Sequence, residues 1–162
     1  MIQAKVAIIN NTDVTDFIIS QVSKLDGQSV KIGIHPEDAS TPYERGGTLG
    51  SIAKKNEFGS GNIPERSFER STFDAKNKVW FSKIRRHLNS SSLRGAFDEE
   101  VVRMAGAVAR DDIKHKIRRM KRPRNAQRTI QRKGFDNPLM ETGKLYRSIK
   151  YKMHRERISG SI

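Results

Sequence analysis

The stretch "FDEEVVRMAGAVARDDIKHKIRRM", residues 97–120, carries the clearest helical pattern in the sequence. Its apolar side chains recur every three or four positions, which places them on one face of a helix. The pattern predicts a helix from about residue 93 to residue 120, and Pro123 ends it because proline cannot continue a helix. The residues predicted to face the core are Phe97, Val101, Met104, Val108, Ile113, Ile117 and Met120.

Alternating apolar residues predict strands on both sides of this helix. Residues 30–34 and residues 149–153 alternate in this way, and Pro36 ends the first of these strands. A further strand is predicted near residues 4–8, followed by an amphipathic helix that reaches Gly27. The order of elements predicts an α+β domain, in which a small, mostly antiparallel sheet packs with two or three longer helices.

Shorter segments connect these elements. Residues 36–50 hold two prolines and three glycines and predict a long exposed loop that is mobile, and residues 51–59 predict one or two helical turns. Pro64 is predicted to begin a helix that runs to about residue 88, because proline is favoured at the first helical position. Its residues at helical spacing are Phe68, Thr72, Phe73, Val79, Trp80, Ile84 and Leu88. Residues 125–134 predict a short helix that Gly134 stops.

The composition predicts one domain with a modest core. The chain has 162 residues, of which 35% are hydrophobic, and we expect a single domain over residues 1–157 with a tail at residues 158–162. The absence of cysteine excludes disulfides and thiolate metal sites. The N-terminal residues contain no long apolar run, so we expect neither a signal peptide nor a transmembrane span, which fits a product made in the cytoplasm.

The positive charge is concentrated in the C-terminal third. The formal net charge of the whole chain is +14. Residues 1–63 carry six basic and seven acidic groups, a net charge of −1, whereas residues 110–157 carry seventeen and five, a net charge of +12. Such a field favours polyanionic partners but does not bear on the fold.

No constellation in the sequence predicts catalysis or a bound cofactor. The four histidines are scattered and none has a second ligand at metal-binding spacing. The acidic clusters at residues 98–100 and 111–112 are explained by a helix start and by nearby basic residues, so a metal-dependent nuclease is not expected. The stretch "YERGGTLG", residues 43–50, lacks the Lys-Ser/Thr pair of a phosphate loop.

The stretch "KHKIRRMKRPRNAQRTIQRK", residues 114–133, holds ten lysines and arginines and no acid. A solvated helix face, favoured by the helix dipole, explains part of this charge. A surface built for solubility alone would usually mix signs, so a surface for DNA phosphates or for an acidic protein is the other interpretation. Sequence-specific base recognition is not expected because no known motif frames the polar side chains. The candidate residues for such a surface are Lys114, Lys116, Arg118, Arg119, Lys121, Arg122 and Arg124.

Two further stretches carry a more specific pattern, "IAKKNEFGSGNIPERSFERST" at residues 52–72 and "RTIQRKGFDNPLMETGKLYRSIKYKM" at residues 128–153. Together they resemble a family of small morphogenesis proteins of long-tailed bacteriophages, called tail-completion, neck or head–tail joining proteins. The first pattern is met by Ala53, Glu57, Phe58, Gly59, Ile63, Pro64, Arg66 and Phe68. The second is met by Thr129, Ile130, Lys133, Gly134, Pro138, Leu139, Thr142, Gly143, Leu145, Ser148 and Ile149. The resemblance spans about residues 30–153.

The motif residues predict structural roles. Gly59 and Gly143 supply backbone conformations that other residues avoid. Phe58 and Phe68 are expected to pack beside the helix that Pro64 begins. Thr142 is expected to cap the turn that carries Leu145 and Ile149 inward.

The resemblance implies a virion protein with no enzymatic activity. Family members resemble ring formers, usually hexamers, that join the tail to the head around the DNA channel. The implied partners are further copies of the chain, the head connector or adaptor, the tail terminator or tube, and the packaged DNA, with no membrane involved. The implied location is the neck or tail of the virion, after assembly in the host cytoplasm. The alternative is a DNA-binding protein without sequence specificity, which the C-terminal charge favours.

Overall fold

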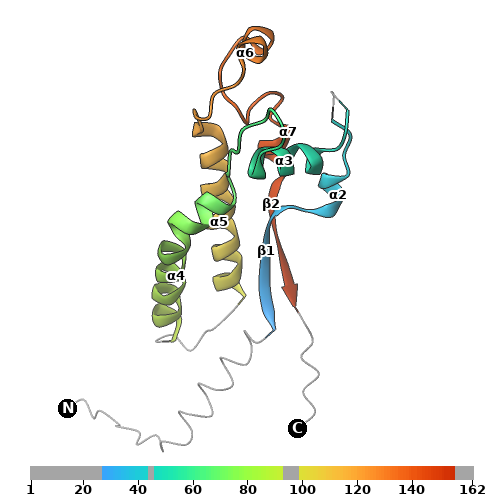
Figure 1. Cartoon of the computed structure of the whole chain (residues 1–162). Helices are drawn as coiled ribbons and strands as arrows, with labels where there is room; N and C mark the ends of the chain where they lie inside the picture. Colours follow the sequence, from blue (N-terminus) through green and yellow to red (C-terminus); the bar gives the residue numbers. More distant parts are fainter. Residues whose placement is uncertain (1–26, 44–45, 93–98, 156–162) are drawn as a thin grey trace, which may run out of the picture.

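The structure is a computed structural model that describes residues 27–43, 46–92 and 99–155 (Figure 1). Its elements are β1 (Gln28–Ile34), α2 (Pro36–Ala39), α3 (Leu49–Phe58), α4 (Arg70–Ser92), α5 (Glu100–Arg119), α6 (Gln127–Lys133), α7 (Lys144–Ser148) and β2 (Ile149–Arg155). The combination of a two-stranded antiparallel sheet with these helices confirms the predicted α+β class. The predicted strand at residues 4–8, the helix after it, Phe97 and the tail at residues 158–162 lie outside the described residues.

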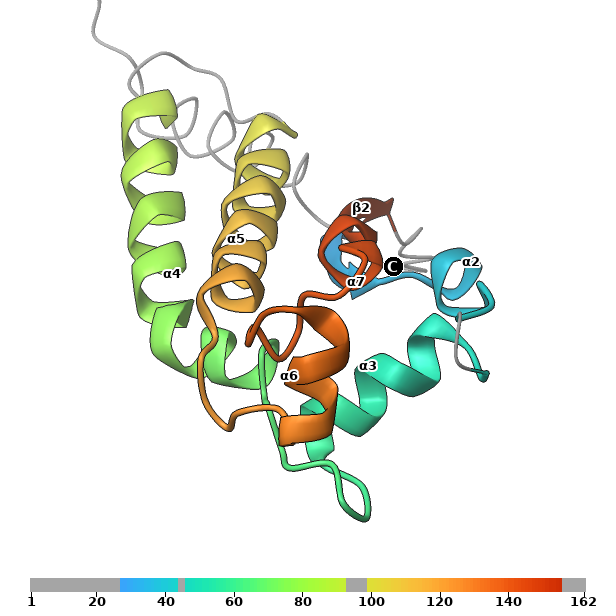
Figure 2. The ribbon, with the colours of Figure 1, turned by 90° about the horizontal axis from the view of Figure 1, so that it is seen from above.

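The two strands join distant parts of the chain. β1 pairs antiparallel with β2 in a register that places Val30 opposite Met153 and Ile32 opposite Tyr151. Helix α5 lies between α4 and the strands, as Figures 1 and 2 both show. Gly106 permits this approach, because a Cβ atom there would lie only 2.6 Å from Val30 Cγ2 and 2.7 Å from Tyr151 Cδ2.

One apolar cluster holds α3, α5, α7 and β2 together. Its members are Leu49, Ala53, Phe68, Ile113, Ile117, Met120, Leu139, Leu145 and Ile149. Phe68, Ile117 and Ile149 are fully buried within it. The predicted stripe of α5 is confirmed for Ile113, Ile117 and Met120 in this cluster, and Val101 is also buried. Both stretches that carry the family pattern contribute to this cluster, so they are parts of one core.

Helix α4 begins later than predicted. Pro64 lies in an irregular segment, and the helix starts at Arg70 because the amide groups at its beginning are held by Glu57, a residue of α3. Phe73 is not part of the core, since 53% of its surface is exposed. Its ring packs edge to face against the Trp80 ring, with the ring centres 6.0 Å apart. Phe58 was predicted to pack beside this helix, and its ring lies 4.4 Å from the guanidinium carbon of Arg70 at the helix start, although Phe58 itself is exposed.

Part of the segment 36–50, which was predicted to be a loop throughout, forms regular structure. Pro36–Ala39 form α2, and Pro42 pairs with Thr48 in an isolated bridge. The Thr48 hydroxyl accepts the Ser51 amide at 3.3 Å, while the Thr48 amide donates to the Ser51 hydroxyl at 3.1 Å. This capping box begins α3, and it places Leu49 in the core.

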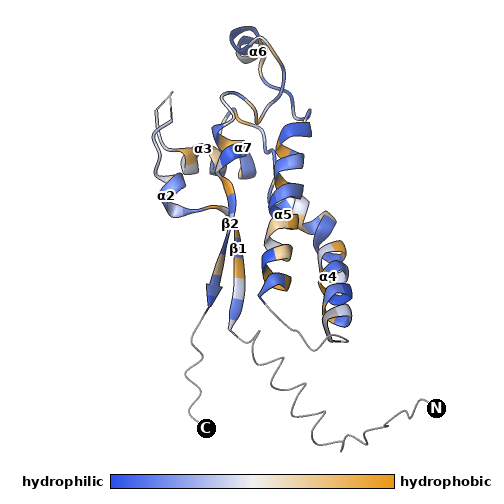
Figure 3. Cartoon of the chain, turned by 180° about the vertical axis from the view of Figure 1, so that it is seen from behind, coloured by the Kyte–Doolittle hydropathy of each residue, from blue (hydrophilic) through white to orange (hydrophobic). Residues whose placement is uncertain are grey.

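The second pattern folds as short helices joined by glycines. Gly134 ends α6 in the left-handed conformation with φ of 77°, as predicted. Gly143 precedes α7 with φ of 75°, and the Thr142 hydroxyl accepts the Lys144 amide in a long hydrogen bond of 3.4 Å. Figure 3 shows α6 mostly in hydrophilic colours, and none of its residues is buried. Among the described residues, no helix is both long and apolar enough to cross a membrane.

Candidate functional site

Glu57 is buried at the end of α3 and caps the beginning of α4. One carboxylate oxygen, Oε2, accepts the amides of Phe68 at 2.7 Å and Glu69 at 3.0 Å. The other, Oε1, accepts the amide of Arg70 at 2.9 Å and the hydroxyl of Ser67 at 2.8 Å. Burial alone would raise the pKa of Glu57, but these hydrogen bonds outweigh it and hold the pKa below its ordinary value. The carboxylate therefore satisfies amides that a helix start leaves without partners.

Arg66 is the second buried charge, and it ties the first pattern to the segment that follows α5. Its Nε donates to the carbonyl of Pro123 at 2.9 Å, and its Nη2 donates to the carbonyl of Arg124 at 2.9 Å. Its Nη1 donates to Asn56 Oδ1 at 3.1 Å. We call Glu57 and Arg66, together with these partners, the charged frame.

The second pattern meets the end of α5 through two further polar contacts. Lys133 Nζ donates to the carbonyl of Asn137 at 2.7 Å, and Asn137 Nδ2 donates to the carbonyl of Arg118 at 2.7 Å. Several of the remaining motif residues differ in how exposed they are to solvent. Leu139, Leu145, Ser148 and Ile149 are buried, Thr129, Pro138 and Thr142 are half-buried, and Pro64 and Gly134 are exposed.

A hollow of about 390 Å³ lies at the C-terminal end of α5, and almost every residue around it is basic. Its lining residues are His115, Lys116, Arg119, Met120, Lys121 and Arg122. We call it the basic hollow. Met120 also belongs to the core cluster, so the hollow rests on packed apolar side chains. His115 Nε2 lies 3.4 Å from Arg119 Nη1, one helical turn away.

The seven basic residues predicted as one surface divide between different places. Lys116, Arg119, Lys121 and Arg122 line the basic hollow, and Arg118 is exposed on the same helical turn. The other two do not join them. Lys114 is half-buried with its Nζ 5.2 Å from the centre of the Tyr146 ring, and Arg124 forms an ion pair with Asp136 at 2.6 Å.

The hollow contains cations without carboxylate partners. Among the described residues, no aspartate or glutamate lies within ion-pair distance of Lys116, Arg119, Lys121 or Arg122. Unpaired cations around a concave surface can bind an oxyanion such as a phosphodiester or a carboxylate. His115 was the residue of this set that sequence reasoning missed, and the signal for it was its i,i+4 spacing to Arg119 in a stretch free of acids.

The described residues contain no group of three histidine, cysteine, aspartate or glutamate side chains that could hold a metal ion. Comparison of the chain with protein-family models, with curated proteins and with solved structures finds no match.

Proposed function

We propose that this chain is a structural protein of a long-tailed bacteriophage virion, which assembles as a ring at the neck and joins the completed tail to the head connector around the DNA channel. It acts after assembly in the host cytoplasm, contacts further copies of itself and neighbouring connector, terminator or tube proteins, and needs no catalytic group or cofactor.

One observation carries the proposal. The stretches at residues 52–72 and 128–153 follow the order of the neck-protein pattern, and their apolar residues pack in a single cluster. Arg66 also binds the carbonyls of Pro123 and Arg124, the two residues that follow Lys121 and Arg122 of the basic hollow. The residues that carry the resemblance and the residues that line the basic hollow therefore belong to one folded unit. This arrangement supports a role beside DNA.

Two measurements test the proposal directly. Native mass spectrometry of the purified full chain should detect a closed ring, and cryo-electron microscopy of virions that encode the chain should place it at the head–tail junction. Virions whose junction lacks the chain would overturn the proposal.

A charge-reversal variant tests the role of the basic hollow within the ring. Changing Arg118, Arg119, Lys121 and Arg122 to glutamate should leave rings intact but impair DNA retention or tail joining, because the reversed surface repels phosphates or acidic neighbours. A control variant with the same change in charge reverses Lys31, Lys54, Lys55 and Lys76, all of which are exposed outside the hollow. Normal infectivity of the hollow variant would remove the hollow from the proposed function.

The second candidate function is a stand-alone DNA-binding protein without sequence specificity, and the unpaired cations of the basic hollow favour it. The two candidates differ in what the monomer does. Tight binding of duplex DNA by a monomer, with affinity that falls steeply with salt, supports the second candidate. Weak monomer binding together with ring formation supports the first.

A further inference from the structure

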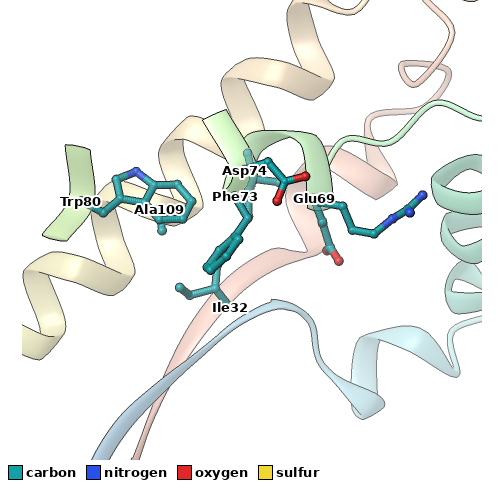
Figure 4. Close-up of a pocket in the computed structure, with 8 residues that line it drawn as sticks. Ile32, Glu69, Phe73, Asp74, Trp80 and Ala109 are labelled. Atoms are coloured by element: carbon teal, nitrogen blue, oxygen red, sulfur yellow. The ribbon is translucent and has the colours of Figure 1, made fainter. Parts of the chain in front are cut away.

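A second hollow, between α4, α5 and β1, is apolar and open. We call it the apolar pocket (Figure 4). It measures about 450 Å³. The residues that line it are Ile32, Glu69, Arg70, Phe73, Asp74, Trp80, Ala109 and Ile113. Phe73 remains 53% exposed here, and an aromatic ring left open beside a pocket of this size favours an apolar occupant.

The two carboxylates at this pocket have no cationic partner. Among the described residues, no lysine or arginine lies within ion-pair distance of Glu69 or Asp74, and the guanidinium of Arg70 is already bound by Glu57 and Glu65. Burial and, to a smaller extent, the neighbouring Glu57 carboxylate together raise the pKa of Glu69 to about 7. An occupant that carries a cation next to its apolar group would relieve this unpaired negative charge.

The chain itself carries a segment of this chemistry. Residues 124–136 form a loop around α6 that is closed at its base, where the Arg124 guanidinium meets Asp136 and the Asn125 amide donates to Asp136 at 3.2 Å. We call it the arm. Figure 1 shows α6 beyond the end of α5 and away from the body of α4. No residue of α6 is buried, Arg128 is exposed and has no carboxylate partner in the described part of the chain, and Phe135, just after α6, is 45% exposed.

We propose that the arm of one copy docks in the apolar pocket of the next copy. Phe135 packs against Phe73 and Trp80, and Arg128 faces Glu69 and Asp74. The contact joins two different surfaces of the same chain, so repeating it with a constant rotation closes a ring. This inference rests on the proposed function, and it names the interface by which the ring forms.

The choice of occupant follows from the other exposed apolar residues. Phe58 lies under Arg70, which already lines the pocket of its own copy, and Val79 and Phe81 belong to α4 itself. Phe135 is the large exposed apolar residue of the described chain that belongs to the arm, and the Lys133 Nζ lies 4.9 Å from its ring centre, so the arm offers a cation next to an apolar group. Within one copy the arm is not part of the pocket lining, so the contact must join two copies.

The lack of native cysteine permits a direct test by disulfide trapping in the full chain. Asp74→Cys and Arg128→Cys are prepared as two separate single variants and oxidised. If the contact is head to tail, neither variant alone should cross-link, their mixture should give a covalent dimer, and the double variant should give a ladder of covalent oligomers. The control replaces Asp74→Cys by Lys76→Cys, an exposed residue two positions along α4 and so on another side of the helix, and should give no dimer.

The outcomes separate this inference from the proposed function. Failure of the mixture to cross-link, while native mass spectrometry still detects rings of the unchanged chain, overturns the arm–pocket contact and leaves the proposed function intact. An unchanged chain that stays monomeric, together with a mixture of the cysteine variants that does not cross-link, overturns both. Equal cross-linking by the Lys76→Cys control also overturns the contact, because trapping is then independent of the pocket.

A charge exchange provides an independent measurement. Asp74→Arg and Arg128→Glu should each weaken self-association roughly fivefold or more, because each places like charges in the contact, and the double variant should recover most of the loss. Phe135→Ala should weaken self-association roughly tenfold or more, since it removes the buried ring. Losses in the double variant that equal the combined losses of the single variants would overturn the pairing of Asp74 with Arg128.

Discussion

The charged frame and the basic hollow lie far apart in the sequence but are neighbours in space, and they use charge in opposite ways. In the frame, Glu57 and Arg66 are buried, and hydrogen bonds reach both carboxylate oxygens of one and all three guanidinium nitrogens of the other. In the hollow, Arg119 and Arg122 are exposed and have no carboxylate partner among the described residues. Buried charges with full partners determine the fold, whereas exposed charges without partners are available for binding.

This difference predicts which substitutions reduce stability and which reduce binding. Substitution of a residue in the charged frame should lower the free energy of unfolding even when no partner is present. Substitution of a residue in the basic hollow should change the free energy of unfolding little and should mainly lower the affinity for an anionic partner.

Glu57→Ala should have the largest effect. The change leaves the amides of Phe68, Glu69 and Arg70 without their acceptor, and we expect the free energy of unfolding to fall by about 3 kcal/mol. Glu57→Gln is the matched control, because it keeps the shape and one acceptor oxygen and should lose roughly half as much. Urea unfolding followed by circular dichroism measures both losses. Equal stability of the alanine variant and the unchanged chain would remove Glu57 from the frame.

Arg66→Leu should have the next largest effect. The carbonyls of Pro123 and Arg124 lose their donors in a partly buried place, and we expect a loss of about 2 kcal/mol in the free energy of unfolding. The change should also loosen the segment that carries Lys121 and Arg122, so hydrogen exchange at residues 120–125 should quicken more than at α3. Unchanged exchange in this segment would show that Arg66 does not position the hollow.

The frame also marks the limit of prediction from the sequence. Helix α5, the strands β1 and β2 and the end of α6 at Gly134 follow from local periodicity and glycine, so they were predictable. The start of α4 was not, because the group that caps it, Glu57, belongs to a different helix. Pro64 gave a local signal for a helix start, and a tertiary contact overrode it.

The basic hollow was only partly predictable for the same reason. Its charge was evident from the lack of acids in residues 114–133. The residues that line it were not evident, because Arg124 forms an ion pair with Asp136, Lys114 lies over the Tyr146 ring, and His115 lines the hollow. The apolar pocket was not anticipated at all, because it needs β1, α4 and α5 brought together.

Glu69→Gln should alter how stability depends on pH. The pKa of Glu69 is raised from 4.5 to about 7, so the folded chain binds this proton more tightly than the unfolded chain. The contribution of Glu69 to the free energy of unfolding is therefore highest below pH 4.5 and falls as the pH rises to about 7. The glutamine variant should lack this fall and should be more stable than the unchanged chain above pH 7, by on the order of 1 kcal/mol because the carboxyl is partly exposed.

Urea unfolding of both chains at several pH values tests the sign of this effect. Glu57 has a lowered pKa and acts in the opposite direction, and it is present in both chains, so the difference between them isolates Glu69. The free energy of unfolding of the glutamine variant minus that of the unchanged chain should increase as the pH rises from 4.5 to 7. A decrease over this range would contradict the prediction.

The smallest effect on stability should come from the hollow itself. Arg119→Gln with Arg122→Gln removes two exposed cations that have no carboxylate partner, so the free energy of unfolding should change by less than about 0.5 kcal/mol. The matched control, Lys54→Gln with Lys55→Gln, removes the same charge from exposed positions of α3.

The two pairs should differ only when duplex DNA is present. If each arginine contacts one phosphate, the slope of log affinity against log salt concentration should become shallower by about 2 in the hollow variant and should not change in the control. Equal slopes for the two pairs would mean that the hollow contributes only net charge and that its shape has no part in binding. A shallower slope for the hollow pair at unchanged stability would instead confirm the contrast with the frame, because the same kind of cation would then serve the fold at Arg66 and a partner at Arg119.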